Sequence, residues 1–139
     1  MMAWLEQGSW CLLRVASGLM MATHGYGKIF EEGRMERFTA GVGEMGFPLP
    51  GLFAWLAALS ELVGGIALAL GLGSRVSAAL IAGTMFVAAF IRHGGDPFEK
   101  KELALLYLVV MLFFAVWGGG RWALDRLLCG CASEKNAKP

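Results

Sequence analysis

The feature that most constrains this chain is a long apolar stretch at residues 52–72, which contains a single charged side chain, Glu61. An α-helix rises about 1.5 Å per residue, so this stretch can cross the roughly 30 Å hydrocarbon core of a bilayer. The composition agrees, because 57% of the 139 residues are hydrophobic and 17% are charged; a soluble domain has about 25% charged residues. We therefore expect an integral membrane protein embedded in the lipid bilayer.

Three further apolar stretches predict three more membrane helices, at residues 4–23, 76–91 and 97–117. Only the turn at residues 73–75 separates 52–72 from 76–91, so these two helices must run antiparallel. The predicted fold is all-α, an integral membrane antiparallel four-helix bundle. It forms a single domain over residues 1–139, with a polar tail at 123–139.

The segments around these helices carry their own signals. A cleaved signal peptide is the alternative for residues 4–23, but the segment lacks a basic start and contains Arg14. Residues 34–45 mix charged and apolar positions, which predicts a short interfacial helix in the long polar loop. Asp96 before Pro97 is typical of a helix start, with the aspartate as N-cap and the proline in the first position.

The charged residues argue against nucleic-acid binding, and together with the cysteines they indicate on which side of the membrane the termini lie. The 12 basic and 11 acidic residues leave no basic surface for nucleic acid. Basic residues divide almost evenly between the two sides of the predicted bundle, so they orient it weakly. The basic tail and the cysteines Cys11, Cys129 and Cys131, which stay reduced in cytosol, favour cytoplasmic termini.

Two ionisable side chains lie deep inside predicted helices. Arg14 and Glu61 are each about 15 Å from either end of their helix. Opposite charges at one depth on neighbouring helices predict a buried ion pair between them, because either charge alone would carry an uncompensated desolvation cost. The pair can be a functional site, or it can only fix the register of the helices.

A second polar cluster is expected where the helices meet the long loops. Its members are His24, Lys28, Arg92, His93 and Glu102. Two histidines and a glutamate beside a lysine could bind a metal ion, ligate a haem or hydrogen-bond the carbonyls of a quinone. The alternative is a set of polar caps at the membrane interface. The pair Cys129 and Cys131 is a weaker motif that could bind a soft metal, exchange thiols or carry palmitate.

The order of these motifs resembles that of the DoxX family of small bacterial and archaeal membrane proteins. The resemblance covers residues 11–125 and depends mainly on His24-Gly25 with Lys28, followed by Glu61-Leu62-Val63-Gly64-Gly65. The further matching positions are Arg14 to Gly18, Gly46-Phe47-Pro48, Leu68, Gly71, His93, Glu102, Gly120-Arg121-Trp122 and Leu124-Asp125.

The resemblance implies a four-helix protein of the prokaryotic inner, or cytoplasmic, membrane. Some members are associated with quinone-linked oxidation of sulfur compounds and others with membrane complexes that handle oxidative or thiol stress. The residues that match the polar pattern of the family are Arg14, His24, Lys28, Glu61, His93 and Glu102. The Cys129 and Cys131 pair is not part of that pattern.

Three functional hypotheses follow. In the first, the polar cluster binds a quinone-like ligand, or a haem or metal cofactor, and the protein is a redox-linked subunit that works with a partner oxidoreductase. In the second, the chain is a non-enzymatic membrane scaffold or assembly factor whose Arg–Glu pair is structural. The third is a small transporter. Small residues on the predicted helices would also permit a homodimer.

Overall fold

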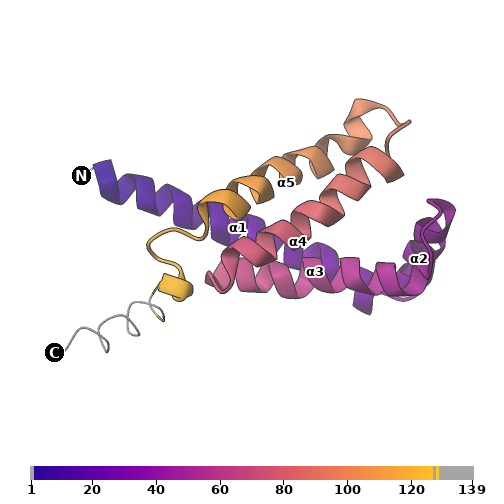
Figure 1. The fold of residues 1–139 in the computed structure, drawn as a ribbon, viewed down its shortest axis with the longest axis horizontal. Coiled ribbons are helices and arrows are strands. Elements are labelled where there is room, and N and C mark those ends of the chain that lie inside the picture. The colour runs from indigo at the N-terminus through magenta and orange to yellow at the C-terminus, as the bar shows by residue number, and fades with distance from the viewer. Residues whose placement is uncertain (1, 127, 129–139) are drawn as a thin grey trace.

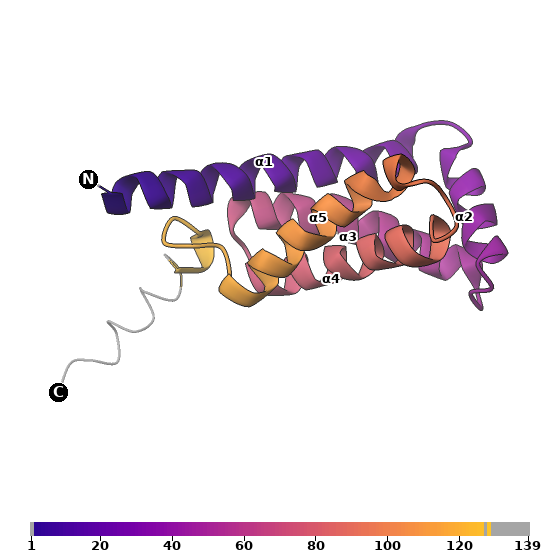
Figure 2. The same ribbon diagram turned by 90° about the horizontal axis from the view of Figure 1, so that it is seen from above.

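The computed structural model describes residues 2–126 and 128, and all regular secondary structure in this part of the chain is helical. The elements are α1 (Met2–Phe30), α2 (Arg34–Glu44), α3 (Pro50–Leu70), α4 (Ser74–Phe86), the π-helix η1 (Val87–Arg92) and α5 (Phe98–Trp117). The π-helix continues directly from α4. Figures 1 and 2 show the long helices lying side by side, with α2 across the end of the molecule opposite the N-terminus.

The predicted all-α class is confirmed, and so is a short helix in the long polar loop, which is α2. Two helices of the described part are long and apolar enough to cross a membrane, Pro50–Leu70 and Ser74–Arg92. They correspond to the predicted helices at 52–72 and 76–91. The helix predicted at 97–117 is present as α5.

The first helix differs from the prediction, because α1 continues to Phe30 instead of ending at residue 23. Glycines weaken a helix, and the sequence places two of them, Gly25 and Gly27, just after residue 23. Gly25 is instead a packing position: a Cβ there would meet the backbone of Leu62 and would lie 2.7 Å from the carbonyl oxygen of Ala58. The extension keeps Lys28 in the last turn of α1, alongside α3.

Small residues hold α1 and α3 close together along their length. A Cβ on Gly18 would lie 2.6 Å from the carbonyl oxygen of Gly65, and a Cβ on Gly65 would lie 2.6 Å from the backbone nitrogen of Ala22. Such close approach between backbones is possible only where side chains are absent or minimal. These contacts fix the register of α1 against α3.

A second set of contacts joins the remaining helices. α3 packs on α4, and α4 packs on α5. The largest fully buried apolar side chains of this core are Met21, Leu68, Ile81, Met111 and Phe114. Figure 1 shows α4 and α5 running at an angle to α1 and α3, so that the two pairs separate toward the end where α2 lies.

We expect Gly18→Ala to destabilise the protein by about 1–3 kcal/mol, because the new methyl group would meet the α3 backbone, which cannot move aside cheaply. Gly8→Ala is the matched control on the same helix, since nothing lies within 4 Å of its would-be Cβ. Its effect should be neutral or slightly stabilising. Denaturant unfolding of both variants in detergent measures the difference, and equal stabilities would contradict the packing described here.

Candidate functional site

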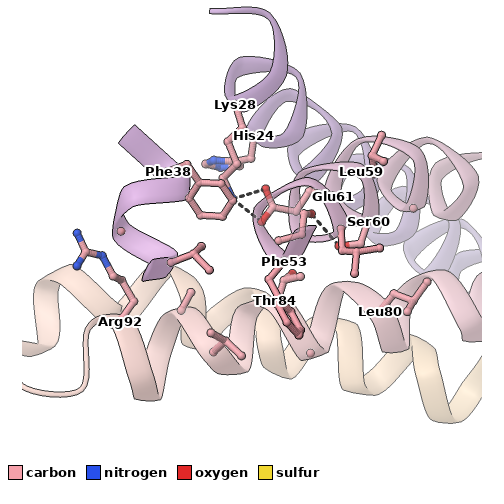
Figure 3. A pocket seen from close by; sticks show the side chains of 18 of the residues that line it. His24, Lys28, Phe38, Phe53, Leu59, Ser60, Glu61, Leu80, Thr84 and Arg92 are labelled. Atoms are coloured by element: carbon pink, nitrogen blue, oxygen red, sulfur yellow. Dashed lines mark hydrogen bonds and ion pairs between the residues drawn. The ribbon is translucent and has the colours of Figure 1, made fainter. Parts of the chain in front are cut away.

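A cavity of about 1090 Å³ lies between α3 and the continuous α4 and η1 helix, with α2 lining one end. Apolar side chains form most of its wall, among them Phe38, Phe53, Leu56, Leu80 and Val87. The ionisable side chains that line it are His24, Lys28, Arg34, Arg37, Glu61, Arg92 and His93. The cavity therefore combines an apolar body with a polar end near α1 and α2 (Figure 3).

The strongest polar interaction in the cavity joins Lys28 to Glu61. The Lys28 ammonium donates to both carboxylate oxygens, with Nζ 2.6 Å from Oε1 and 2.7 Å from Oε2. The Glu61 side chain is 1% exposed, whereas that of Lys28 is 24% exposed. Lys28 Nζ also lies 4.3 Å from the centre of the Phe38 ring, which adds a cation–π contact.

The predicted ion pair between Arg14 and Glu61 is wrong. Arg14 is buried, but its guanidinium donates to the backbone carbonyls of Gly119 and Trp122 beyond the end of α5. The prediction assumed that equal depth in two helices places residues opposite each other. The glycine contacts set a different register, in which Gly25 lies against Ala58 and Leu62, so Glu61 is near the end of α1.

His24 lines the cavity near Lys28, and its ring packs against the buried Tyr107 of α5 in an edge-on arrangement, with the ring centroids 5.9 Å apart. The hydroxyl of Tyr107 has no hydrogen-bond partner among the described residues. No sequence pattern singles out Tyr107, because a tyrosine in an apolar helix is ordinarily a packing residue.

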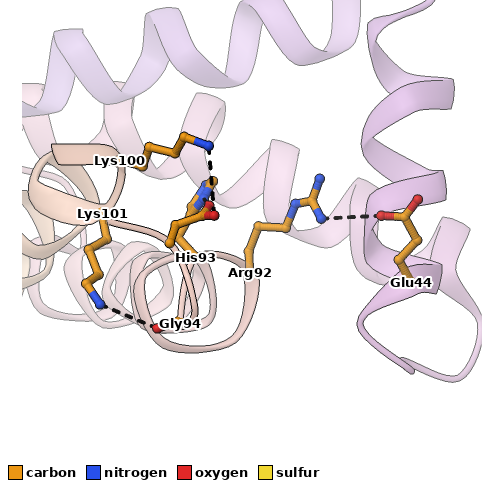
Figure 4. A network of polar contacts seen from close by, with 7 residues as sticks. Glu44, Arg92, His93, Gly94, Lys100 and Lys101 are labelled. Carbon is orange, nitrogen blue, oxygen red and sulfur yellow. Dashed lines mark hydrogen bonds and ion pairs between the residues drawn. The ribbon is translucent and has the colours of Figure 1, made fainter. Parts of the chain in front are cut away.

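The π-helix places two more polar groups at the opposite wall. Arg92 donates to Glu44 of α2 at 3.3 Å, and His93 Nδ1 lies 2.8 Å from the Oδ2 atom of Asp96 (Figure 4). This hydrogen bond, together with the nearby positive charge of Lys100, holds the pKa of the Asp96 carboxyl below its usual value, although partial desolvation opposes the shift. π-Helical turns of this kind are frequent at functional sites.

The expected N-cap role of Asp96 is also wrong. The N-cap of α5 is Pro97, with no side-chain cap hydrogen bond, since the Asp96 carboxylate contacts His93 and Lys100 instead.

Glu102 does not join the cluster, because its side chain is exposed and does not line the cavity. Cys129 and Cys131 lie outside the described residues. Cys11 is half-buried on α1, with its Sγ 3.8 Å from Arg14 Nη2. Over residues 2–126 and 128, no three or more His, Cys, Asp or Glu side chains group closely enough to hold a metal ion.

Sequence reasoning missed the contribution of α2 to the site. Arg37, Phe38, Gly41 and Val42 from this helix line the cavity, and the last two are buried. The sequence predicts that this helix lies on the membrane surface. Its mixture of apolar and charged residues equally suits a helix that covers one end of a cavity. That amphipathic pattern was the signal available.

Comparison with known proteins identifies the family. The family model described as DoxX matches residues 9–94, which is more than half of the chain and includes α2, α3 and the cavity-lining residues of α1. The chain belongs to the DoxX family. The resemblance found in the sequence is thereby confirmed, and the protein is a membrane protein of this family.

This DoxX protein also matches individual relatives over most of its length. It is 29% identical over 128 residues to the inner membrane protein YqjF of Escherichia coli K12, covering 89% of this chain and 95% of the relative. It is 35% identical over 120 residues to a protein of Haemophilus influenzae, with 81% and 85% covered. It is 33% identical over 116 residues to the Bacillus subtilis protein named "Putative oxidoreductase CatD", with 82% of each chain covered. No solved structure matches it significantly.

The ion-pair assignment can be tested by double-mutant cycles on unfolding free energy. Lys28→Met and Glu61→Gln should each destabilise the protein, and together they should lose less than the sum, with a coupling of about 1–3 kcal/mol. Arg14→Met combined with Glu61→Gln should be additive, because the two side chains bind different partners. Coupling of Glu61 to Arg14 and not to Lys28 would restore the original prediction.

Proposed function

We propose that this DoxX protein is a redox-linked membrane subunit whose cavity binds a quinone-like ligand, in cooperation with a partner oxidoreductase. The observation that carries the proposal is the form of the cavity. Its apolar walls end at the ion pair between Lys28 and the buried Glu61, and His24 and His93 also line it. An amphipathic ligand with a ring that carries carbonyl oxygens matches that combination.

The Lys28 side chain can bind such a ligand without giving up Glu61. An ammonium group has three N–H donors, and two of those of Lys28 point at the Glu61 oxygens. The third has no hydrogen-bond acceptor among the described residues, so a carbonyl oxygen of the ligand can accept from it. Phe38, whose ring lies 4.3 Å from Lys28 Nζ, offers an aromatic surface for the ligand ring beside this donor.

The chemistry that this site would support is quinone reduction or its reverse. A quinone takes up two electrons and two protons to become a quinol, and the partner oxidoreductase supplies or removes the electrons. Lys28 would stabilise the negative charge that develops on the quinone oxygen, and Lys28 and Glu61 would exchange protons with that oxygen. The naming of the B. subtilis relative as an oxidoreductase supports a redox role.

We further propose that α1, α3, α4 with η1, and α5 all span the membrane as one domain, with both termini in the cytoplasm. At about 1.5 Å per residue, α5 with its 20 residues is about as long as the hydrocarbon core is thick. Large apolar side chains are exposed on both outer helices: Leu12 and Leu19 on α1, and Leu106, Val109 and Val116 on α5. Lipid contact would explain their exposure.

A scaffold or assembly factor is the second candidate. One observation favours it: Lys28 already donates to both oxygens of Glu61, so the ion pair needs no ligand. The pair would then have a structural role alone, which is to fix α1 against α3. In that case the cavity would bind no quinone.

Binding of decylubiquinone, a short-tailed quinone, separates the two candidates. We expect the purified protein to bind it, and organic extracts to contain quinone detectable by mass spectrometry. Glu61→Gln should weaken binding about tenfold, because the loss of the counter-charge reorients Lys28. Thr84→Phe, which fills the cavity from α4 and leaves the ion pair intact, should abolish it.

Glu102→Gln is the matched control, since it removes the same charge from an exposed position outside the cavity and should change affinity less than twofold. Absence of quinone from the extracts together with absence of binding would favour the scaffold. Full binding by both Glu61→Gln and Thr84→Phe would place the ligand elsewhere and contradict the proposal.

A further inference from the structure

The wall of the cavity away from the Lys28–Glu61 pair carries an oriented histidine. His93 follows the π-helix and lines the cavity together with Ala88 and Arg92. Its backbone N–H donates to Ala88 at 3.0 Å, and its carbonyl accepts from the Asp96 N–H at 3.1 Å, so the backbone position is fixed from both sides. The side chain is fixed as well, by the 2.8 Å contact of Nδ1 with Asp96.

The carboxylate determines which ring nitrogen carries the proton. An ionised carboxylate only accepts hydrogen bonds, so Nδ1 must present its N–H to Asp96. The lowered pKa of Asp96, caused first by this hydrogen bond, is consistent with an ionised group. Nε2 is then the nitrogen left for a ligand. In neutral imidazole it accepts a hydrogen bond, and in imidazolium it donates one.

We infer that His93, oriented by Asp96, distinguishes the two redox states of the ligand, because neutral His93 accepts from a quinol hydroxyl and protonated His93 donates to a quinone carbonyl. This inference rests on the proposed function, and it adds a specificity-determining residue to the site. Quinone binding is strengthened in acid and quinol binding at higher pH. No proton transfer is required for this discrimination.

Other charged groups lie around His93 and act on its side chain electrostatically. They are Arg92 on η1, Asp96 in the turn, Lys100 and Lys101 on α5, Arg34, Arg37 and Glu44 on α2, and His24, Lys28 and Glu61 across the cavity. Of these, only His24 carries the same titratable group as His93, an imidazole. A test must therefore separate the two histidines.

A purely structural role for His93 is the competing explanation. The same hydrogen bond lies within the turn between η1 and α5. Lys100 forms an ion pair with Asp96 in that turn, and Lys101 donates to the carbonyl of Gly94. Removal of the hydrogen bond between His93 and Asp96 would lower the stability of the folded protein by the same amount with either redox form of the ligand present. It would leave the relative affinity for quinone and quinol at each pH unchanged.

The experiment titrates decylubiquinone, and anaerobically decylubiquinol, at pH 5.5 and 7.5. Neither probe changes charge in this range, since a phenolic hydroxyl ionises near pH 10. The ratio of the quinone Kd to the quinol Kd should rise about tenfold from pH 5.5 to 7.5 in the unaltered protein. His93→Gln should make the ratio independent of pH. His24→Gln should retain most of the change.

Asp96→Ala provides the second variant. It should reduce the pH response of the ratio, because the carboxylate no longer holds Nδ1 and leaves Nε2 as the nitrogen free for the ligand. Thermal unfolding without ligand reports any loss of stability separately. A pH response that survives in His93→Gln, or that disappears in His24→Gln alone, would overturn the inference. So would a constant ratio in the unaltered protein when both probes bind, whereas failure to bind either probe would contradict the proposed function itself.

Discussion

A carboxylate in the middle of an apolar helix needs a positive partner, and the rest of this structure is arranged so that Lys28 can supply one. Glu61 is 1% exposed and would carry a large desolvation cost if it were unpaired. Lys28 reaches it only because α1 continues through Gly25 and Gly27 to Phe30. Gly18 and Gly65 bring the helices close enough for the ammonium to contact both oxygens.

The sequence was sufficient to predict the kind of fold and the residues at stake, but not their pairing. Glu61 stood out because no other charge interrupts its apolar stretch, and Lys28 and the histidines stood out at helix ends. The partner of Glu61 depended on the register of α1 against α3. That register is set by backbone contacts at Gly18, Gly25 and Gly65. The position of a charged residue along its own helix does not reveal how the two helices are aligned.

Arg14 shows how a buried cation can be satisfied without a carboxylate. Backbone carbonyl groups outside regular secondary structure have no helical donor, and when buried they need another hydrogen-bond partner. Gly119 and Trp122, just past α5, direct such carbonyls at the guanidinium, and Trp10 donates to Gly118 beside them. This chain segment also caps α4, since Asp125 accepts from the backbone of Gly73 and Ser74. A sequence search for opposite charges could not find partners that are backbone atoms.

The two ends of the molecule are therefore built differently, and this difference produces the cavity. At the end near the N-terminus, Arg14 and Asp125 tie α1, α4 and the segment after α5 together. At the other end the helix pairs separate, and the space between them is bordered by α2. Substitutions at the closed end should act on stability alone, whereas those near α2 act on a space large enough for a ligand. Lys28 and His93 both line the cavity at that open end, where binding can be coupled to their charge.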